Sequence, residues 1–349
     1  DIYGNPLQTT DANGISTSIK WGYEYSRAKA EIKNSVDGGC GFIDLEDGWN
    51  NWETGNSSIS SNIAHTGLKS SLSNNDFGPT KNFYIANGVD ITKTYILDAW
   101  VYKTSGTATI TIEVRNTSDV NLLNKEAVST GADGWEHISV KVTPAEMSSL
   151  SNVSYLRAWC GFEGTGNSGY VDDIRFYPED AAMATMTYDP ASLLITSKSD
   201  ENSIPVYIQY DNLGRPSQVY KTIDGVKTLT GGLSYSFSRD TYSDFNSSLP
   251  NSKTTILYDG SGNNKQVKEL FDGFNRTVQQ QIKDGSSTIF ASSTTYDLNN
   301  RVDKVFKSYE NTSTFGQYDA NYSTNSDSYN GTTGGYPYSQ TSYYSDPLN

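Results

Sequence analysis

A short turn pattern that recurs in the second half of the chain constrains the fold most strongly. An aromatic residue followed by aspartate precedes an arginine by five positions in YDNLGR (210–215), FDGFNR (271–276) and YDLNNR (296–301). Asp, Asn and Gly tolerate a left-handed backbone and form turn hydrogen bonds through a short side chain. The aromatic and β-branched residues on either side favour paired strands. Each copy therefore predicts the turn of an antiparallel β-hairpin.

Further aromatic-Asp pairs extend this pattern into a repeat. Tyr-Asp also occurs at 188, 258 and 318, and Asn263 takes the place of the arginine after Tyr258. Most successive pairs lie 22 to 25 residues apart, whereas the interval from 258 to 271 has room for one strand pair only. The residues between the turns alternate but are largely polar on both faces, so such units must stack on their neighbours to be stable. We therefore expect antiparallel hairpins joined in series.

The repeat is interrupted near the N-terminus. Residues 3–14 (YGNPLQTTDANG) share its turn residues and strand-like segments follow up to Ile32, but the pattern then stops and resumes near Met186. The segment 37–179 holds five of the six tryptophans, and its strands alternate apolar and polar residues. Strict alternation predicts half-buried strands, and a segment of this length suits one β-sandwich. We therefore predict an all-β chain, with an antiparallel hairpin ribbon in segments 1–36 and 180–349 and a β-sandwich jelly roll at 37–179.

The composition excludes several kinds of partner. The 349 residues include 26 Lys and Arg against 40 Asp and Glu, a net charge of −14, so the chain cannot neutralise a phosphate backbone and no nucleic-acid partner is expected. No apolar run has transmembrane length, so no membrane insertion is expected. An acidic chain rich in Tyr, Ser, Thr, Asn and Gly is typical of a secreted or cell-surface β-protein, and we expect it to be a fragment of a longer one.

The sequence also lacks the patterns of common catalytic sites. Its two histidines, His65 and His137, offer no Cys/His metal spacing, and no Gly-rich phosphate loop, serine elbow or thiol–imidazole arrangement occurs. Paired carboxylates serve glycoside hydrolysis only in a cleft of set width, so we predict that the chain is not an enzyme. Cys40 and Cys160 both lie in the middle segment, where they could form a disulfide or remain two buried thiols.

The polar side of the sandwich strands is a candidate binding face. Flat aromatic rings can cover the C–H faces of a sugar, while Glu, Arg and His side chains can bond its hydroxyl groups. This face could instead rest on the repeat sheet or on a loop. The residues that we predict to bind carbohydrate are Trp100, Tyr102, Glu113, Arg115, His137, Tyr155, Arg157 and Trp159.

The repeated units resemble the YD repeats of RHS-type proteins. The segments YGNPLQTTDANG (3–14) and YSQTSYYSDPLN (338–349) are similar to bacterial secreted members of that family. The resemblance implies long β-sheet ribbons that spiral into hollow shells, which in such proteins can enclose a toxic or enzymatic C-terminal region. The family's self-cleaving segment and variable cargo do not occur in this sequence, so no toxin activity is implied for it.

The middle segment resembles the jelly-roll carbohydrate-binding modules of the CenC-like and galactose-binding type. The matching stretches are GFIDLEDGW (41–49), AHTGLKSSL (64–72), YILDAWVY (95–102), GWEHISVKV (134–142) and YVDDIRFYP (170–178). Such modules often carry a structural Ca²⁺, which takes about six to eight oxygen ligands. Ile43 departs from the pattern, because many relatives have glutamate there. The resemblance implies as calcium ligands backbone oxygens of residues 66–69 and the carboxylates of Asp44 or Glu46 and of Asp172 or Asp173.

The function that we predict is a non-catalytic one. The repeats would form a shell or fibre scaffold of a larger secreted protein, and the jelly roll would bind a polysaccharide or another glycan. Two alternatives remain open. The chain could be a self-assembling extracellular subunit without sugar affinity, or part of the shell of a toxin-delivery protein whose cargo lies outside this sequence.

Overall fold

The computed structural model describes residues 1–74, 77–223, 226–236, 251–259, 263–285, 287–332 and 335–343. The chain forms two compact units, one of residues 1–208 and 222–226 and the other of residues 209–221 and 227–349. Both consist almost entirely of antiparallel strands, which confirms the prediction of an all-β chain. Among the described residues no helix is long and apolar enough to cross a membrane.

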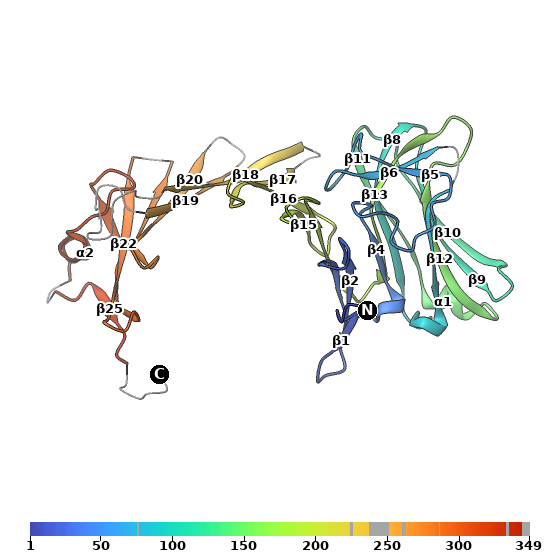
Figure 1. Ribbon diagram of the computed structural model, residues 1–349, viewed down its shortest axis with the longest axis horizontal. Helices are drawn as coiled ribbons and strands as arrows, with labels where there is room; N and C mark the ends of the chain where they lie inside the picture. Colours follow the sequence, from blue (N-terminus) through green and yellow to red (C-terminus); the bar gives the residue numbers. More distant parts are fainter. Residues whose placement is uncertain are drawn as a thin grey trace. The chain divides into compact units, whose positions relative to one another are not determined.

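The first unit contains a β-sandwich of two antiparallel sheets (Figure 1). The larger sheet has the order β11 (Trp135–Val142), β8 (Tyr95–Ser105), β13 (Ser168–Pro178), β6 (Ser70–Asn74) and β5 (Ser57–Ser60), and β4 (Gly41–Ile43) pairs with β13. The smaller sheet has the order β10 (Asn121–Val128), β9 (Thr109–Asn116), β12 (Val153–Gly161) and β7 (Phe77–Tyr84). The short helices η1 (Asp37–Gly39), η2 (Ile85–Asn87) and α1 (Pro144–Ser148) lie in the connections.

The core of the sandwich follows the alternation in its strands. The rings of Phe83 and Phe176 stack between the sheets with centroids 4.1 Å apart. Each fully buried side chain of this size stabilises the fold by about 1.5 to 3 kcal/mol. Six residues that the alternation predicts to face inward are at most 2% exposed: Leu97, Ala99, Val101, Ile110, Ile112 and Val114.

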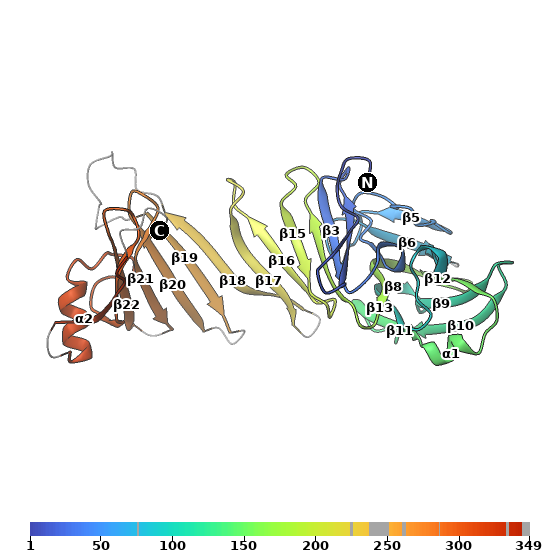
Figure 2. The same cartoon turned by 90° about the horizontal axis from the view of Figure 1, so that it is seen from below.

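Hairpin strands flank the sandwich on both sides in the sequence. Before it come β1 (Gln8–Thr10), β2 (Ser16–Gly22) and β3 (Arg27–Lys33), and after it come β14 (Ala182–Tyr188), β15 (Ile195–Ser199) and β16 (Pro205–Tyr210). Strand β3 pairs directly with β14, so that Lys33 lies opposite Ala182. Figure 2 shows β3 next to ribbon strands that follow the sandwich in the sequence, among them β15. The hydrogen-bond ladder therefore continues across the insertion, and the sandwich connects two neighbouring strands of one ribbon.

The sandwich packs onto these ribbon strands through apolar and polar contacts. The fully buried guanidinium group of Arg175 on β13 donates to the backbone oxygen of Asp200 (2.9 Å) and to Thr185 Oγ1 (3.0 Å). Cys40 lies in the apolar contact between sandwich and ribbon, whereas Cys160 lies in the sandwich core. Both thiols are free. The apolar contact consists of Ala30, Ile32, Cys40, Phe42, Tyr177 and Met183.

The second unit is a series of hairpins. Its strands pair in the order β17-β18-β19-β20-β21-β22-β23-β25, and β24 pairs with β22. A helix, α2 (Tyr322–Asn330), was not predicted, because its residues show no apolar period. The strands are β17 (Pro216–Ile223), β18 (Val226–Ser236), β19 (Asn251–Tyr258), β20 (Asn264–Phe271), β21 (Thr277–Asp284), β22 (Ile289–Tyr296), β23 (Val302–Phe306), β24 (Tyr309–Asn311) and β25 (Tyr338–Gln340).

The turn at Asp272 shows why the repeated pattern forms hairpins. Its Oδ1 accepts hydrogen bonds from the backbone N–H groups of Phe274 (2.9 Å) and Arg276 (3.0 Å), and its Oδ2 accepts one from Arg276 Nε (2.8 Å). The turns at Asp211 and Asp297 repeat these bonds. Aspartate thus orders the turn and arginine closes it, which is a structural use of both residues.

Two of the predicted repeat units differ from the expectation. Tyr258 and Phe271 end the successive strands β19 and β20, so the interval between them is one strand and not a strand pair. Tyr318-Asp319 opens no hairpin, because Asp319 Oδ2 accepts hydrogen bonds from Tyr309 Oη and Asn325 Nδ2, both at 2.7 Å, and the chain continues into α2. The sequence also predicts a second turn at Asp224-Gly225. This pair, residues 260–262 in the turn after Tyr258, and the closing residues 344–349 lie outside the described residues.

Candidate functional site

The predicted carbohydrate-binding residues do not share one face. Trp100 and Tyr102 on β8 and His137 on β11 lie on the outer side of the larger sheet. The other five lie on the outer side of the smaller sheet, on the opposite side of the sandwich. Alternation separates inward from outward residues but does not say which of two sheets a strand joins, so the single predicted face was wrong. The five are Glu113, Arg115, Tyr155, Arg157 and Trp159.

On the smaller sheet these side chains bond one another. Glu113 Oε2 accepts from Arg115 Nε (2.5 Å), and its Oε1 accepts from the indole Nε1 of Trp159 (3.3 Å). Arg157 Nη2 lies 3.0 Å from Asp119 Oδ1, and hydrogen bonds from Tyr155 and Arg115 hold the pKa of Asp119 below its usual range. Trp159 is 4% exposed and Tyr155 is 6% exposed. This face is therefore a satisfied network whose rings offer little surface to a ligand.

The outer side of the larger sheet carries an aromatic cluster with more accessible rings. His65 stacks on Trp100 with centroids 3.9 Å apart and an interplanar angle of 16°. The ring of Trp135 lies 5.5 Å from His65 and 5.7 Å from Tyr102, and Tyr170 lies 6.3 Å from Tyr102. The rings of Trp100, Tyr102, Trp135 and Tyr170 are half-buried. We call these five residues, His65, Trp100, Tyr102, Trp135 and Tyr170, the outer aromatic cluster.

Sequence reasoning found Trp100 and Tyr102 but missed the rest of this cluster. Trp135 could have been found, because it is two residues before His137 and so faces the same side of β11. His65 comes from the loop before β6 and gave no signal. The indole Nε1 of Trp100 donates to both the backbone oxygen and the Oγ of Ser203 at 3.2 Å, so the turn after β15 fixes this ring from the ribbon side.

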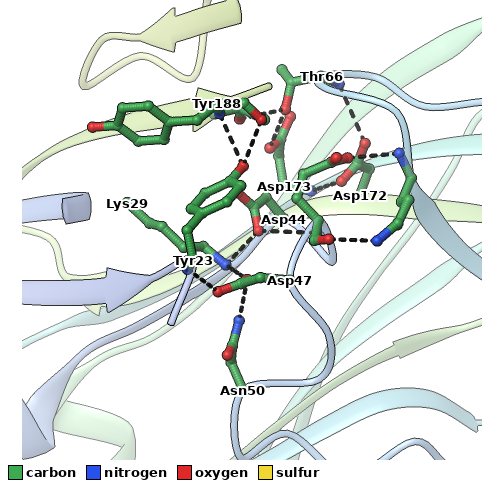
Figure 3. Close-up of polar contacts among 12 residues, drawn as sticks. Tyr23, Lys29, Asp44, Asp47, Asn50, Thr66, Asp172, Asp173 and Tyr188 are labelled. Carbon is green, nitrogen blue, oxygen red and sulfur yellow. Dashed lines mark hydrogen bonds and ion pairs between the residues drawn. The ribbon is translucent and has the colours of Figure 1, made fainter. Parts of the chain in front are cut away.

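The predicted calcium ligands lie in a buried acidic cluster (Figure 3). Lys29 from ribbon strand β3 places its Nζ 2.5 Å from Asp44 Oδ1 and 2.5 Å from Asp47 Oδ1. Burial alone would lower the pKa of Lys29, but the two carboxylates outweigh it and raise that pKa. Lys29 is 2% exposed, and Asp44 is fully buried. A lysine of the ribbon thus supplies a positive charge to two carboxylates of the sandwich, those of Asp44 and Asp47.

The remaining carboxylates accept hydrogen bonds from the loop that holds His65. Asp173 Oδ2 lies 2.7 Å from His65 Nδ1, and Asp172 Oδ2 accepts from the backbone N–H of His65 at 2.8 Å. Glu46 Oε1 accepts from the N–H groups of Leu68 (2.7 Å) and Lys69 (2.6 Å). Burial raises the pKa of Glu46 to about 7 and raises that of Asp172 well above its usual range.

These residues fit an internal ammonium group better than a calcium ion. In the described part of the chain, no three His, Cys, Asp or Glu side chains converge in a way that could hold a metal. Asp44 Oδ2 and Glu46 Oε2 are buried without a hydrogen-bond partner, which leaves two oxygens where calcium takes about six to eight. Calcium at Asp44, Glu46, Asp172 and Asp173 stays a prediction.

A hollow lies where the ribbon meets the sandwich, and the sequence did not predict it. It has a volume of about 610 Å³ and is lined by β2, the turn after it, the loop that follows β4, and β7. Trp21, Tyr25 and Lys81 belong to this lining, and so does Tyr84, whose ring lies beside that of Tyr155 on the outer side of the smaller sheet. These residues are far apart in the sequence, so only the fold brings them together. We call this space the junction hollow.

Comparisons with known proteins match separate parts of the chain. A family model described as a domain of unknown function, DUF6443, matches residues 243–349. No curated protein matches the chain.

Solved structures with a similar fold include several carbohydrate-binding modules. The CBM22-1 xylan-binding domain of Paenibacillus barcinonensis Xyn10C has 14% identity, covers 39% of this chain and 92% of its own, and gives a TM-score of 0.31. The C-terminal family 22 carbohydrate-binding module of Clostridium thermocellum Xyn10B has 14% identity, covers 42% of this chain and 97% of its own, and gives a TM-score of 0.33. A family 16 carbohydrate-binding module has 18% identity, with 38% and 94% covered and a TM-score of 0.28.

Proposed function

We propose that the chain is a non-catalytic, carbohydrate-binding part of a larger secreted or cell-surface protein. The observation that carries this proposal is the outer aromatic cluster on the larger sheet. Trp135, Tyr102 and Tyr170 present half-buried rings at one place, each with a polar group on its ring system. Such rings offer apolar surface to the C–H face of a sugar and bond its hydroxyl groups at their edge.

The contacts with the ribbon support this assignment over the face on the smaller sheet. Ser203 holds the indole of Trp100, and Asp173 and Trp100 hold the imidazole of His65, so the inner rings of the cluster are fixed before a ligand arrives. Preorganised side chains lose less conformational freedom on binding, which favours affinity. On the smaller sheet, by contrast, a sugar would have to displace bonds that Glu113 and Arg157 already make.

The ribbon is proposed to act as a scaffold similar to the YD-repeat shells of RHS-type proteins. Asp–Arg pairs stabilise the turns at Asp211, Asp272 and Asp297. One observation favours a structural role in assembly as the second candidate function. The tips of three YD turns carry large apolar side chains in solvent, with exposed fractions of 76% for Leu213, 75% for Phe274 and 103% for Leu298.

A glycan array with the whole chain tests the first proposal. We expect the chain to bind at least one plant or bacterial polysaccharide. The double variant Trp135→Ala/Tyr102→Ala should lower the affinity for that polysaccharide at least about tenfold. Tyr329→Ala on α2 is the matched control, because it removes a ring that is 53% exposed at a distance in sequence from the sandwich. Unchanged binding by the double variant would refute the assignment to this cluster. Oligomers without sugar affinity, seen by light scattering, would favour the assembly function.

A further inference from the structure

The junction hollow contains an ammonium group, that of Lys81, to which none of the described residues offers a hydrogen-bond acceptor or an ion-pair partner. Lys81 on β7 is half-buried in its lining, and its Nζ lies 5.8 Å from the ring centroids of both Trp52 and Phe83. Among the described residues, Lys81 forms no hydrogen bond or ion pair. The other two lysines of the lining are paired, Lys20 with Asp37 at 2.6 Å and Lys29 with Asp47 at 2.5 Å. One cation of this hollow is therefore available to a ligand.

The surroundings of Lys81 make an anionic ligand favourable there. Burial lowers the pKa of Lys81 and the nearby ammonium group of Lys20 lowers it further, whereas the carboxylate of Asp37 acts in the opposite direction without outweighing them. A charged group that has lost water without gaining a partner destabilises the fold, and an opposite charge restores the lost interaction. A carboxylate next to Lys81 would gain a charge-assisted hydrogen bond in a place partly shielded from water.

The rings of the hollow indicate what else such a ligand carries. Tyr25, which lines the hollow, is 46% exposed and so presents ring surface to the opening. The indole Nε1 of Trp21 donates to the backbone oxygen of Pro6 at 2.8 Å, which fixes the orientation of that ring. The amide side chains of Asn51 and Asn87 are exposed in the same lining. Rings together with neutral amides suit the C–H faces and hydroxyl groups of a saccharide.

We propose that the junction hollow binds an acidic saccharide, with a uronic-acid carboxylate on Lys81 and a sugar ring against Trp21 or Tyr25. A volume of about 610 Å³ lies within the usual range of small-molecule sites. This site is separate from the outer aromatic cluster. It is formed jointly by ribbon and sandwich, so neither of them would have it alone.

Titration calorimetry on the whole chain tests this proposal with oligogalacturonate as the probe and its methyl ester as the uncharged counterpart. We expect the acid form to bind at least about tenfold more tightly than the ester, since only the carboxylate can form a charge-assisted hydrogen bond with the ammonium group of Lys81. Lys81→Met should remove that preference and leave the binding of the ester unchanged. Lys81→Arg should keep most of the preference. Lys141→Met, on an exposed lysine of β11, is the matched control and should change nothing.

Several outcomes would overturn the proposal. Equal affinity for the acid and the ester, no binding of either, or an unchanged preference in Lys81→Met would each refute it. Equal binding of polyglutamate and oligogalacturonate would refute the saccharide part of it. Trp135→Ala should leave this binding unchanged, so a failure at the outer aromatic cluster and a failure at the junction hollow can be told apart.

Discussion

The guanidinium carbon of Arg276 lies 4.5 Å from the ring centroid of Tyr296, the aromatic residue that precedes the next YD turn. An arginine over an aromatic face contributes about 0.5 to 2 kcal/mol, depending on its exposure to water. Each arginine of this kind bonds its own turn aspartate and also contacts a ring further along the chain. The guanidinium carbon of Arg215 lies 4.4 Å from the ring centroid of Tyr235, and that of Arg301 lies 4.1 Å from the ring centroid of Tyr343.

Replacing Arg276 should therefore loosen the second unit. We expect Arg276→Met to lower its free energy of unfolding by about 1 to 2 kcal/mol, because both the paired contact with Asp272 and the ring contact are lost. Arg276→Lys should recover less than half of this, because an ammonium group cannot copy the planar two-point contact. Urea denaturation measures the change. Full recovery by lysine would show that charge alone matters at this turn.

The YD turns should also make the second unit sensitive to acid. Burial would raise the pKa of Asp272, but hydrogen bonds from Arg276 outweigh it and hold that pKa below its usual range. The pKa of Asp272 in the folded state is therefore below its unfolded value of about 3.9. The stabilisation that the ionised carboxylate gives to the fold is complete above about pH 3.9. It is lost as the pH falls through the folded-state pKa. Urea midpoints between pH 2 and 6 should drop steeply at the acid end, and Asp272→Asn should show a smaller drop.

Removing Lys29 should destabilise the first unit much more than removing an exposed lysine. Lys29→Met leaves Asp44 and Asp47 without their cation, and breaking a buried ion pair costs about 3 to 5 kcal/mol. Lys20→Met, which breaks a partly exposed pair with Asp37, should cost about 1 kcal/mol or less. Thermal unfolding of both variants gives the comparison. Equal effects would mean that the acidic cluster does not need Lys29.

Chelation of divalent metal tests whether the buried acidic cluster binds calcium in addition to the ammonium group of Lys29. With Lys29 in place, we expect EDTA to leave the melting temperature of the wild-type chain unchanged within about 1 °C. A fall of several degrees that added calcium reverses would support calcium at Asp44, Glu46, Asp172 and Asp173. In Lys29→Met the same calcium addition measures whether the vacated acidic cluster can take the ion.

The two cysteines should be unreactive in the native chain. Burial raises the pKa of the Cys160 thiol, so little nucleophilic thiolate forms there near neutral pH. Because Cys40 and Cys160 lie in different apolar clusters, they are not expected to bridge. A thiol reagent should detect almost no thiol in the folded protein and two per chain in unreduced denaturant. One or no thiol after denaturation would contradict this arrangement.

The turns were predictable because their chemistry is local. Asp272 and Arg276 are four residues apart and bond each other directly, so the pattern in the sequence contains nearly all of the interaction. The alternation of β8 and β9 likewise states which residues face the core. The helix α2 was missed because no apolar stripe marks it.

The candidate sites were harder to predict because they depend on which strands meet. Trp100 and Trp159 alternate in the same way along their strands, yet they lie on opposite sides of the sandwich. Lys29 belongs to a repeat-like segment and gave no sign that it would reach Asp44. The junction hollow depends on the packing of the ribbon against the sandwich, which the sequence does not encode in any single stretch.

The pairing of Lys33 with Ala182 has a consequence for how this protein could arise and be engineered. The whole sandwich occupies the place of a hairpin loop, and a loop of that length costs little more entropy than a shorter one because the cost grows only logarithmically. A short turn that joins β3 to β14 should restore a plain hairpin, provided that the polar groups now under the sandwich are replaced. A different binding domain could therefore be inserted between β3 and β14 in place of the sandwich.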